Sequence, residues 1–201
     1  MRIILIRHPE TIANENKIIY GTSDYEYSDN GNIMFQQVLD NFAKEKIKLA
    51  TIYSSPRGRA NKLANEIARI SESQVIIDEL IREMEFGIFE NLNPEDAKNK
   101  YPEFFGKFME GYTEFKIPEG ESFSEVFERA KKFLAQIISL NEDCIVVSHG
   151  MFIKASISYL LDLKLEESWH FNIKPGAMID INYENSYGSL SELKNVRGGA
   201  K

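Results

Sequence analysis

Two short runs of consecutive apolar residues constrain the fold of this chain more strongly than any other feature. Residues 3–6 read Ile-Ile-Leu-Ile close to the N-terminus, and residues 144–147 read Cys-Ile-Val-Val far along the chain. A strand with apolar side chains on both faces is typical of a parallel sheet that lies between two layers of helices. We therefore expect an α/β fold in which both runs form central strands.

Segments with the period of an amphipathic helix lie between the expected strands. The clearest covers residues 123–138, where one face stays apolar over several turns, and Ser122 with Glu125 forms a capping box at its start. Other helices are expected over residues 35–42, 63–70 and 151–161. Other strands are expected over residues 51–54, 169–173 and 178–183. The alternation predicts a three-layer α/β sandwich with a mostly parallel central sheet flanked by helices.

The chain shows no internal repeat and no linker rich in Pro, Gly or Ser, so residues 1–201 are expected to form a single domain. Residues 83–120 are expected to form a lid or insert, and residues 188–201 a flexible tail. The insert is rich in aromatic residues over positions 101–115. These would either line a lid or pack as a helix on the core.

Charge and cysteine content limit the location and the partners. The formal net charge of −7 argues against nucleic acid or an anionic membrane as a partner, because both need a basic face. The lone cysteine, Cys144, excludes an intramolecular disulfide, and the apolar start of the chain is too short for a signal peptide or a membrane span. We therefore expect a cytoplasmic protein, either a monomer or a homodimer.

Polar residues follow the expected strands at the points where these strands end. Arg7 and His8 follow the first apolar run, Ser55 follows the strand at 51–54, and His149 follows the late apolar run. In a parallel sheet the carboxyl ends of the strands lie at the same edge. The four side chains are therefore expected to meet in one cleft.

Histidine beside arginine favours a phosphate site over a metal site. Arginine repels a cation, and no third His or Cys has the spacing of a metal ligand, so no metal is expected. A guanidinium group matches phosphate oxygens bidentately and keeps its charge. Arg59, in the first turn of an expected helix, is a second candidate phosphate ligand, and Arg57 is its exposed competitor. A carboxylate within residues 82–90 would hold the proton that a leaving alcohol needs.

On these residues the chain resembles the histidine phosphatase superfamily, which includes phosphoglycerate mutases and α-ribazole phosphatases. The family's opening pattern, Arg-His-Gly-Glu-Thr/Ser with Asn six residues after the His, is met by residues 7–11 and Asn14, with Pro9 in place of Gly. Residues 55–64 match Ser-x-x-x-Arg-Ala-x-x-x-Ala, which places the family's second arginine on Arg59. Further matches follow in the family's order: Gly-x-x-Asp at 21–24, Glu-x-x-Phe-Gly at 83–87, Pro-x-Gly-Glu-Ser at 118–122 and Ser-His-Gly at 148–150.

The resemblance implies a phosphoglycerate mutase-like fold and a metal-independent phosphatase. His8 would attack phosphorus and form a phosphohistidine, while Glu83 would protonate the leaving alcohol and then take a proton from water. The residues implied to bind the phosphoryl oxygens are Arg7, Arg59 and His149, with Asn14 as a further donor. Those expected to contact the substrate are Tyr20, Gly21 and Gly150. The expected partner is a small phosphorylated metabolite, with inorganic phosphate as product and no cofactor.

Departures from the family pattern leave alternatives open. Pro9 lacks a backbone N–H and has a fixed φ, so a protein that binds phosphate without turnover is one alternative. A phosphoglycerate mutase is another, although the stretch between Arg82 and Arg129 holds no arginine that would bind a substrate carboxylate. A metal-dependent hydrolase is the third. Asn91, where the family usually has Gly, is a lesser departure. The short insert without arginine favours the phosphatase.

Overall fold

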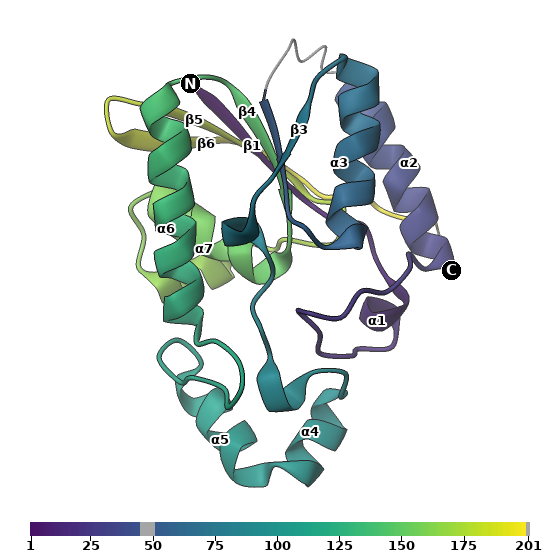
Figure 1. Ribbon diagram of the computed structural model, residues 1–201, viewed down its shortest axis with the longest axis vertical. Helices are drawn as coiled ribbons and strands as arrows, with labels where there is room; N and C mark the ends of the chain where they lie inside the picture. Colours follow the sequence, from purple (N-terminus) through teal and green to yellow (C-terminus); the bar gives the residue numbers. More distant parts are fainter. Residues whose placement is uncertain (45–50, 200–201) are drawn as a thin grey trace.

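The computed structural model describes residues 1–44 and 51–199, and its centre is a six-stranded sheet in the order β3-β2-β4-β1-β5-β6 (Figure 1). The strands of this sheet are β1 (Arg2–Arg7), β2 (Thr51–Ser54), β3 (Val75–Ile77), β4 (Cys144–Ser148), β5 (Met178–Glu184) and β6 (Tyr187–Lys194). The two apolar runs of the sequence lie in β1 and β4, which are neighbours in the middle of the sheet. Their expected place as central strands is confirmed.

Four of these strands run parallel and place their carboxyl ends at one edge. β3 pairs with β2, β2 with β4 and β4 with β1, and Arg7 lies opposite Ser148 at the end of the β1–β4 pair. β5 runs antiparallel to β1, and β6 runs antiparallel to β5. The mostly parallel sheet is therefore confirmed, with an antiparallel hairpin added at one side.

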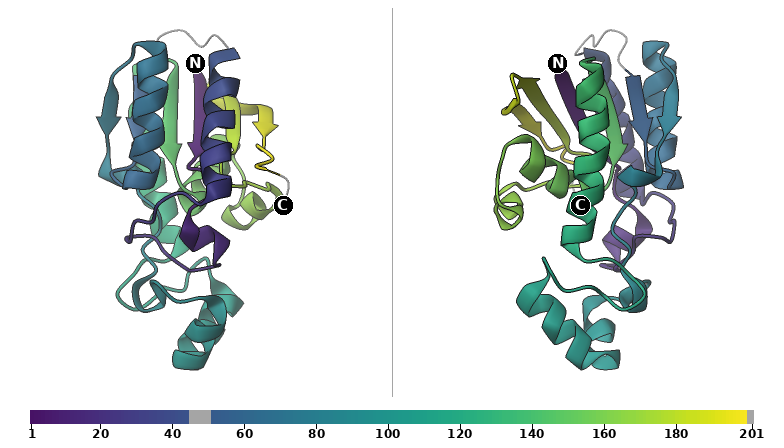
Figure 2. Two further views of the ribbon diagram at one scale, coloured as in Figure 1. Left: turned by 90° about the vertical axis from the view of Figure 1, so that its right-hand side faces the viewer. Right: turned by 60° about the vertical axis from the view of Figure 1, so that its left-hand side comes forward.

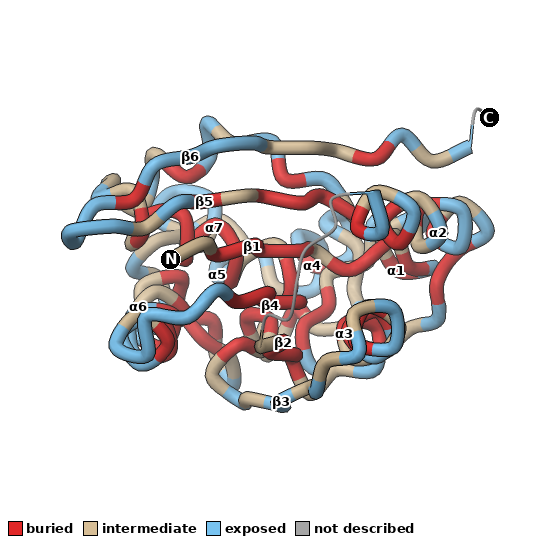
Figure 3. The backbone as a smooth tube through the Cα atoms, turned by 90° about the horizontal axis from the view of Figure 1, so that it is seen from above, coloured by how far each residue is buried: buried red, intermediate tan, exposed pale blue. Residues whose placement is uncertain are grey.

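Helices cover both faces of the sheet (Figures 1 and 2). Those on one face are α2 (Asp29–Lys44) and α3 (Gly58–Ser71), and those on the other are α6 (Phe123–Leu140) and α7 (Gly150–Leu160). Because side chains alternate along a strand, β1 sends Ile4 and Ile6 into the core under α2 and α3, and Ile3 and Leu5 into the core under α6 and α7. From above, the central strands are buried between both layers, whereas much of β6 is exposed (Figure 3). The three-layer sandwich is confirmed.

The long helix α6 shows how local sequence specifies an element. The Ser122 hydroxyl accepts a hydrogen bond from the N–H of Glu125, and the Glu125 carboxylate accepts one from the N–H of Ser122, so the expected capping box is present. The helix ends at Asn141, whose left-handed conformation (φ 52°) is one that asparagine tolerates. Its apolar stripe, including the buried rings of Phe123 and Phe133, packs on the sheet.

The segment between β3 and α6 lies beyond the carboxyl edge of the sheet, at the lower end of Figure 1. Its elements are the 3₁₀ helices η1 (Glu79–Ile81) and η2 (Gly87–Phe89) and the helices α4 (Pro94–Lys100) and α5 (Pro102–Gly111). The rings of Tyr101, Phe105 and Phe108 surround Phe89, with centroid distances between 5.8 and 6.3 Å. The aromatic residues of positions 101–115 therefore pack on the main core, except Phe104, which is exposed.

The prediction of a strand over residues 169–173 is wrong. Leu165–His170 forms a 3₁₀ helix, η3, instead. The ammonium group of Lys154 donates to the carbonyls of Ser168 (3.1 Å) and Phe171 (2.9 Å), so these carbonyls are satisfied by a side chain and not by a neighbouring strand. None of the helices in the part of the chain that the structure describes is long and apolar enough to cross a membrane.

The prediction of a flexible tail over residues 188–201 is also wrong for residues 188–194, because these belong to β6. Asn185 and Ser186 both have positive φ, at 52° and 62°, which is the geometry of a two-residue type I′ turn. This turn folds the chain back on β5, and β6 then pairs along its length.

Candidate active site

The carboxyl ends of β1, β2 and β4 bring together the polar residues that follow them. The N–H of His8 donates to the Ser148 carbonyl at 3.0 Å, and the N–H of Ser55 donates to the Val147 carbonyl at 3.1 Å. The rings of His8 and His149 lie edge to face with centroids 5.2 Å apart. Residues distant in sequence therefore meet at this edge of the sheet, as expected from the strand ends.

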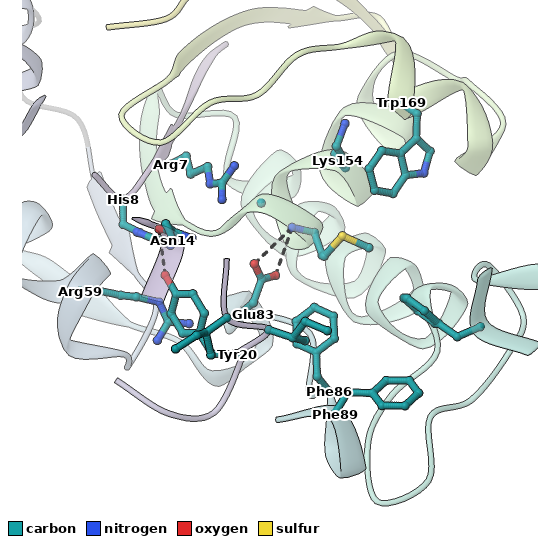
Figure 4. A pocket seen from close by; sticks show the side chains of 15 residues that line it. Arg7, His8, Asn14, Tyr20, Arg59, Glu83, Phe86, Phe89, Lys154 and Trp169 are labelled. Carbon is teal, nitrogen blue, oxygen red and sulfur yellow. Dashed lines mark hydrogen bonds between the residues drawn. The ribbon is translucent and has the colours of Figure 1, made fainter. Parts of the chain in front are cut away.

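A cavity of about 290 Å³ opens at this edge (Figure 4). The polar part of its lining consists of Arg7, His8, Asn14, Tyr20, Arg59, Glu83 and Lys154. The remaining lining residues are Gly150 and the apolar or aromatic Ile18, Ile19, Phe86, Phe89, Phe108, Met151 and Trp169. In Figure 4 His8, Asn14 and Arg59 lie together at one side of the cavity, whereas Lys154 lies beside the Trp169 ring at another side.

His8 is fixed in one tautomer. Its Nδ1 lies 2.7 Å from the carbonyl oxygen of Pro9, and because a carbonyl only accepts, Nδ1 carries the proton and Nε2 keeps a lone pair. Burial lowers the pKa of His8 well below its usual value, and the charges of Arg59 and Arg7 lower it further. The ring is therefore neutral and has one unprotonated nitrogen.

His149 is oriented by Ser55, whose hydroxyl oxygen lies 2.7 Å from Nε2. The same hydroxyl accepts from the N–H of Arg57 at 3.3 Å, and its own hydrogen is available for donation to Nε2 of the tautomer that carries its proton on Nδ1. This Nδ1 is buried and has no partner among the described residues. Burial, with the charges of Arg59 and His8, lowers the pKa of His149 well below its usual value. His149 is therefore neutral, and its Nδ1 is free of protein contacts among the described residues.

Two arginines lie at the same end of the cavity. Arg59, 3% exposed, donates to the carbonyls of Gly21 and Ser23 and to the carboxylate of Asp24, at 2.7 to 2.9 Å, and its guanidinium lies over the Tyr20 ring. Arg7 donates to the Ile173 carbonyl at 2.7 Å. In both arginines Nε is buried without a partner among the described residues, and such a donor is suited to an anion. Arg57 does not line the cavity.

Glu83 lies across the cavity from His8 and is 8% exposed (Figure 4). Its Oε1 accepts from the N–H of Met84 at 3.0 Å and from the N–H of Met151 at 3.1 Å. Met151 belongs to the first turn of α7, where the N–H groups have no partner within the helix and can donate to a side-chain oxygen. The carboxyl group therefore has a fixed position at the cavity wall.

The expected substrate contacts divide into two groups. Asn14, Tyr20 and Gly150 line the cavity. The side-chain oxygen Oδ1 of Asn14 accepts from the N–H of Thr11 and from the Tyr20 hydroxyl, so the NH2 group of the same side chain points away from these two donors. Gly21 does not line the cavity. Its N–H donates to the Glu90 carboxylate, and a Cβ at this position would lie 1.8 Å from the Met84 carbonyl oxygen. Gly21 therefore allows a close approach of two backbone segments.

A sequence model of the histidine phosphatase superfamily (branch 1) matches residues 3–196. The chain belongs to this superfamily. Phosphoserine phosphatase 1 of Hydrogenobacter thermophilus is 30% identical over 195 residues, which cover 96% of this chain and 92% of the relative. A protein of Escherichia fergusonii named probable phosphoglycerate mutase GpmB is 27% identical over 92% of this chain and 86% of its own length. The crystal structure of the α-ribazole phosphatase of Shigella flexneri has a TM-score of 0.87 at 24% identity, over the whole of both chains.

The residues in which this histidine phosphatase departs from the family pattern fit their positions. Pro9 uses its carbonyl, which accepts from His8, so the N–H that proline lacks has no part in this contact. Asn91 has a φ of 65°, a left-handed conformation in which asparagine replaces glycine at little cost. Both residues are therefore compatible with the backbone conformation that they occupy.

Several contributors to the site of this histidine phosphatase were not identified from the sequence. The Glu90 carboxylate accepts from the N–H groups of Gly21, Thr22 and Ser23, at 2.9 to 3.0 Å, and so holds the loop whose carbonyls bind Arg59. Lys154 is a cation within a nearly all-apolar helix, and this isolation was a usable signal of a special position. Residues 1–44 and 51–199 contain no cluster of three or more His, Cys, Asp or Glu side chains placed to hold a metal ion.

Proposed function

We propose that this histidine phosphatase hydrolyses a small phosphomonoester through a phosphohistidine on His8, without a metal ion. The state of the His8 ring carries the proposal. Nδ1 donates to the Pro9 carbonyl and leaves the lone pair on Nε2, while burial and the charges of Arg59 and Arg7 lower the pKa and keep the ring neutral. A neutral imidazole held beside guanidinium groups has what an in-line attack on a bound phosphoryl group needs.

In the first step Nε2 of His8 attacks phosphorus, and the bond between phosphorus and the leaving oxygen breaks. Arg7, Arg59 and the Nδ1–H of His149 bind the equatorial oxygens, on which negative charge is concentrated. The carboxylic acid of Glu83 gives its proton to the leaving oxygen, so the alcohol departs neutral. Each donor is already oriented by the protein, which lowers the cost of assembling the transition state.

In the second step water attacks the phosphohistidine. The Glu83 carboxylate, formed in the first step, takes a proton from this water as its oxygen bonds to phosphorus. The bond between phosphorus and Nε2 breaks, which releases inorganic phosphate and restores neutral His8 and protonated Glu83. The charges of Arg7 and Arg59 serve both steps, so the proposal requires no metal ion or other cofactor.

The cavity supports a small substrate. Its volume of about 290 Å³ lies just below the range of about 300–1,000 Å³ that is common for small-molecule sites. A phosphoryl group would occupy the end near His8, and the leaving alcohol would lie against the apolar wall that includes Phe86, Phe108 and Trp169. The relative named phosphoserine phosphatase makes phosphoserine the first substrate to test.

The second candidate function is a phosphoglycerate mutase, which the relative of that name supports. A mutase holds a carboxylate-bearing substrate while its phosphate is returned. Phe108 is the residue of α4 and α5 that lines the cavity, so the insert brings no cation there. Lys154, which lines the cavity from α7, already donates to the carbonyls of Ser168 and Phe171. We therefore favour hydrolysis. Interconversion of 2- and 3-phosphoglycerate after priming with 2,3-bisphosphoglycerate would decide for the mutase.

We also propose a cytoplasmic location and a monomeric or homodimeric state. The single cysteine supports the first, because Cys144 is buried in β4 and the chain has no second cysteine for a disulfide. Size-exclusion chromatography with light scattering measures the second.

The experiment is a phosphate-release screen over p-nitrophenyl phosphate, phosphoserine, α-ribazole phosphate, sugar phosphates and nucleotides, with and without EDTA. Radiolabelled substrate should leave an acid-labile phosphoenzyme in the wild type. His8→Ala should lose this phosphoenzyme and about a thousandfold or more of turnover. His170→Ala, a change at an exposed histidine outside the cavity, should keep both. A His8→Ala variant that retains the wild-type rate would refute the proposal.

A further inference from the structure

Arg129 is a buried arginine of α6 that does not line the cavity, and α6 runs alongside η1 in Figure 1. Its guanidinium donates five hydrogen bonds. The acceptors are the carbonyls of Leu80 (2.8 Å), Arg82 (2.6 Å) and Glu83 (3.0 Å) and the two carboxylate oxygens of Glu121 (3.0 Å each). A planar guanidinium with donors on every nitrogen suits such a set of acceptors, whereas an ammonium does not.

The carbonyl acceptors belong to η1 and to the residues that follow it, a segment that pairs with no strand of the described sheet, whereas Glu121 lies just before α6. The Ser148 hydroxyl donates to the carbonyl of Ile81 at 2.6 Å, between two of the carbonyls that Arg129 binds. Consecutive carbonyls from Leu80 to Glu83 are therefore all held by side chains from α6 and the end of β4. A backbone tethered at each residue has little freedom to shift.

Glu121, Arg129 and Ser148 together form a clamp on residues 80–85, and Glu121 holds its far end. Its carboxylate balances the charge of Arg129, accepts from the guanidinium of Arg82 at 3.0 Å and accepts from the N–H of Glu85 at 3.0 Å. Its own N–H donates to the Glu85 carbonyl at 2.8 Å. Because Arg82 and Glu85 are held in this way, the backbone of Glu83 is fixed both before and after this residue. Its carboxyl group lines the cavity.

We propose that Arg129 is a positioning residue for Glu83, holding its backbone so that the carboxyl group reaches the leaving oxygen of the substrate. This inference rests on the proposed function, because it concerns the proton that Glu83 gives to the leaving alcohol. Proton transfer requires hydrogen-bond distance between acid and leaving oxygen, so a displacement of a fraction of an ångström lowers its rate. A residue that only stabilises the fold would affect all substrates alike.

The test compares leaving groups. An alkyl phosphate such as phosphoserine needs its leaving oxygen protonated, whereas p-nitrophenolate leaves readily as an anion. Arg129→Lys keeps the charge but not the planar set of donors. It should reduce kcat/KM for the alkyl phosphate about ten- to a hundredfold, as part of the contribution of a general acid, and that for p-nitrophenyl phosphate by less than about threefold. The ratio kcat/KM is used because it reports the transfer to His8.

Two further variants tie the effect to Glu83. Glu83→Gln should show the same dependence on the leaving group, and the double variant Glu83→Gln/Arg129→Lys should lose no more than Glu83→Gln alone, because both changes act on one proton transfer. Arg69→Lys, at an exposed arginine that pairs with Glu66, is the matched control and should leave both substrates unaffected. If Arg129→Lys does not fold, Glu121→Gln, which keeps the shape of the side chain, provides the same comparison.

Equal losses on both substrates, or additive losses in the double variant, would overturn the inference while leaving the phosphatase intact. A wild type that hydrolyses neither substrate, nor any other in the screen, would instead refute the proposed function, and the inference with it.

Discussion

The buried histidines of the site make the stability of the fold depend on pH. Burial and the charges of Arg59 and Arg7 lower the pKa of His8 well below its usual value, and burial with Arg59 and His8 lowers that of His149. In the unfolded chain both rings titrate near pH 6.5. Below about pH 6.5 the unfolded state therefore gains protons that the folded state does not take up, and the folded state loses stability as the pH falls.

The magnitude follows from the pH interval. A ring that stays neutral in the folded state costs about 1.4 kcal/mol for each pH unit below the unfolded pKa, or about 2 kcal/mol between pH 7 and pH 5. His8→Asn and His149→Asn should each reduce the loss of stability over this interval by about that amount. Both changes leave the other titrating groups of the chain in place, so the difference between variant and wild type isolates the ring.

Urea denaturation at pH 7 and pH 5 measures the effect, with the free energy of unfolding extrapolated to water. His170→Asn, a change at the exposed histidine, is the control. Between pH 7 and pH 5 its free energy of unfolding should fall by as much as that of the wild type. If the wild type and His8→Asn lose equal stability between pH 7 and pH 5, the buried neutral ring is refuted, and with it the observation on which the phosphohistidine proposal rests.

Three other perturbations test the parts that hold the site. Ser55→Ala removes the hydroxyl that orients His149, so kcat/KM for p-nitrophenyl phosphate should fall about tenfold, the effect of one hydrogen bond of about 1–1.5 kcal/mol, as steady-state kinetics would show. Gly21→Ala places a methyl group 1.8 Å from the Met84 carbonyl oxygen and should lower the free energy of unfolding by about 1–3 kcal/mol in urea denaturation. Glu90→Ala leaves the N–H groups of the Arg59-binding loop without their acceptor, so inorganic phosphate should inhibit more weakly and the free energy of unfolding should fall by about 2 kcal/mol.

Where local signals are strong, the sequence predicted the layers of the fold and the polar side chains that lie at the strand ends. Short, uniformly apolar runs rich in β-branched residues favour central strands, and because β1 and β4 are parallel neighbours, His8 and His149 follow them at the same edge of the sheet. Ser122 and Glu125 marked the start of α6 because a capping box is encoded within four residues. The expected positions of Arg7, Arg59 and Glu83 at the cavity followed from the same strand ends and motifs.

The features that the sequence did not predict depend on contacts between distant segments. Gly21 matched a motif, but its place under Met84 and beside Glu90 follows only from the folded loop. β6 has few apolar residues, and the hairpin that pairs it with β5 depends on the turn at Asn185. The clamp formed by Arg129 joins α6 to the segment that carries Glu83, and no spacing in the sequence reveals which carbonyls an arginine will bind.

Pro9 directly follows the proposed nucleophile, and its contact with His8 argues for a ring that is held more firmly than glycine would hold it. The contact that orients His8 uses the carbonyl of the following residue, which proline retains. A proline ring fixes φ near −65°, so the carbonyl of Pro9 can move only by rotation about ψ, whereas the carbonyl of a glycine can move by rotation about both φ and ψ. The Nδ1–H of His8 therefore meets an acceptor that is already in place before substrate binds. Replacing Pro9 by glycine should therefore make the His8 ring more flexible and lower kcat in steady-state kinetics. A rise in kcat after this change would contradict the reasoning.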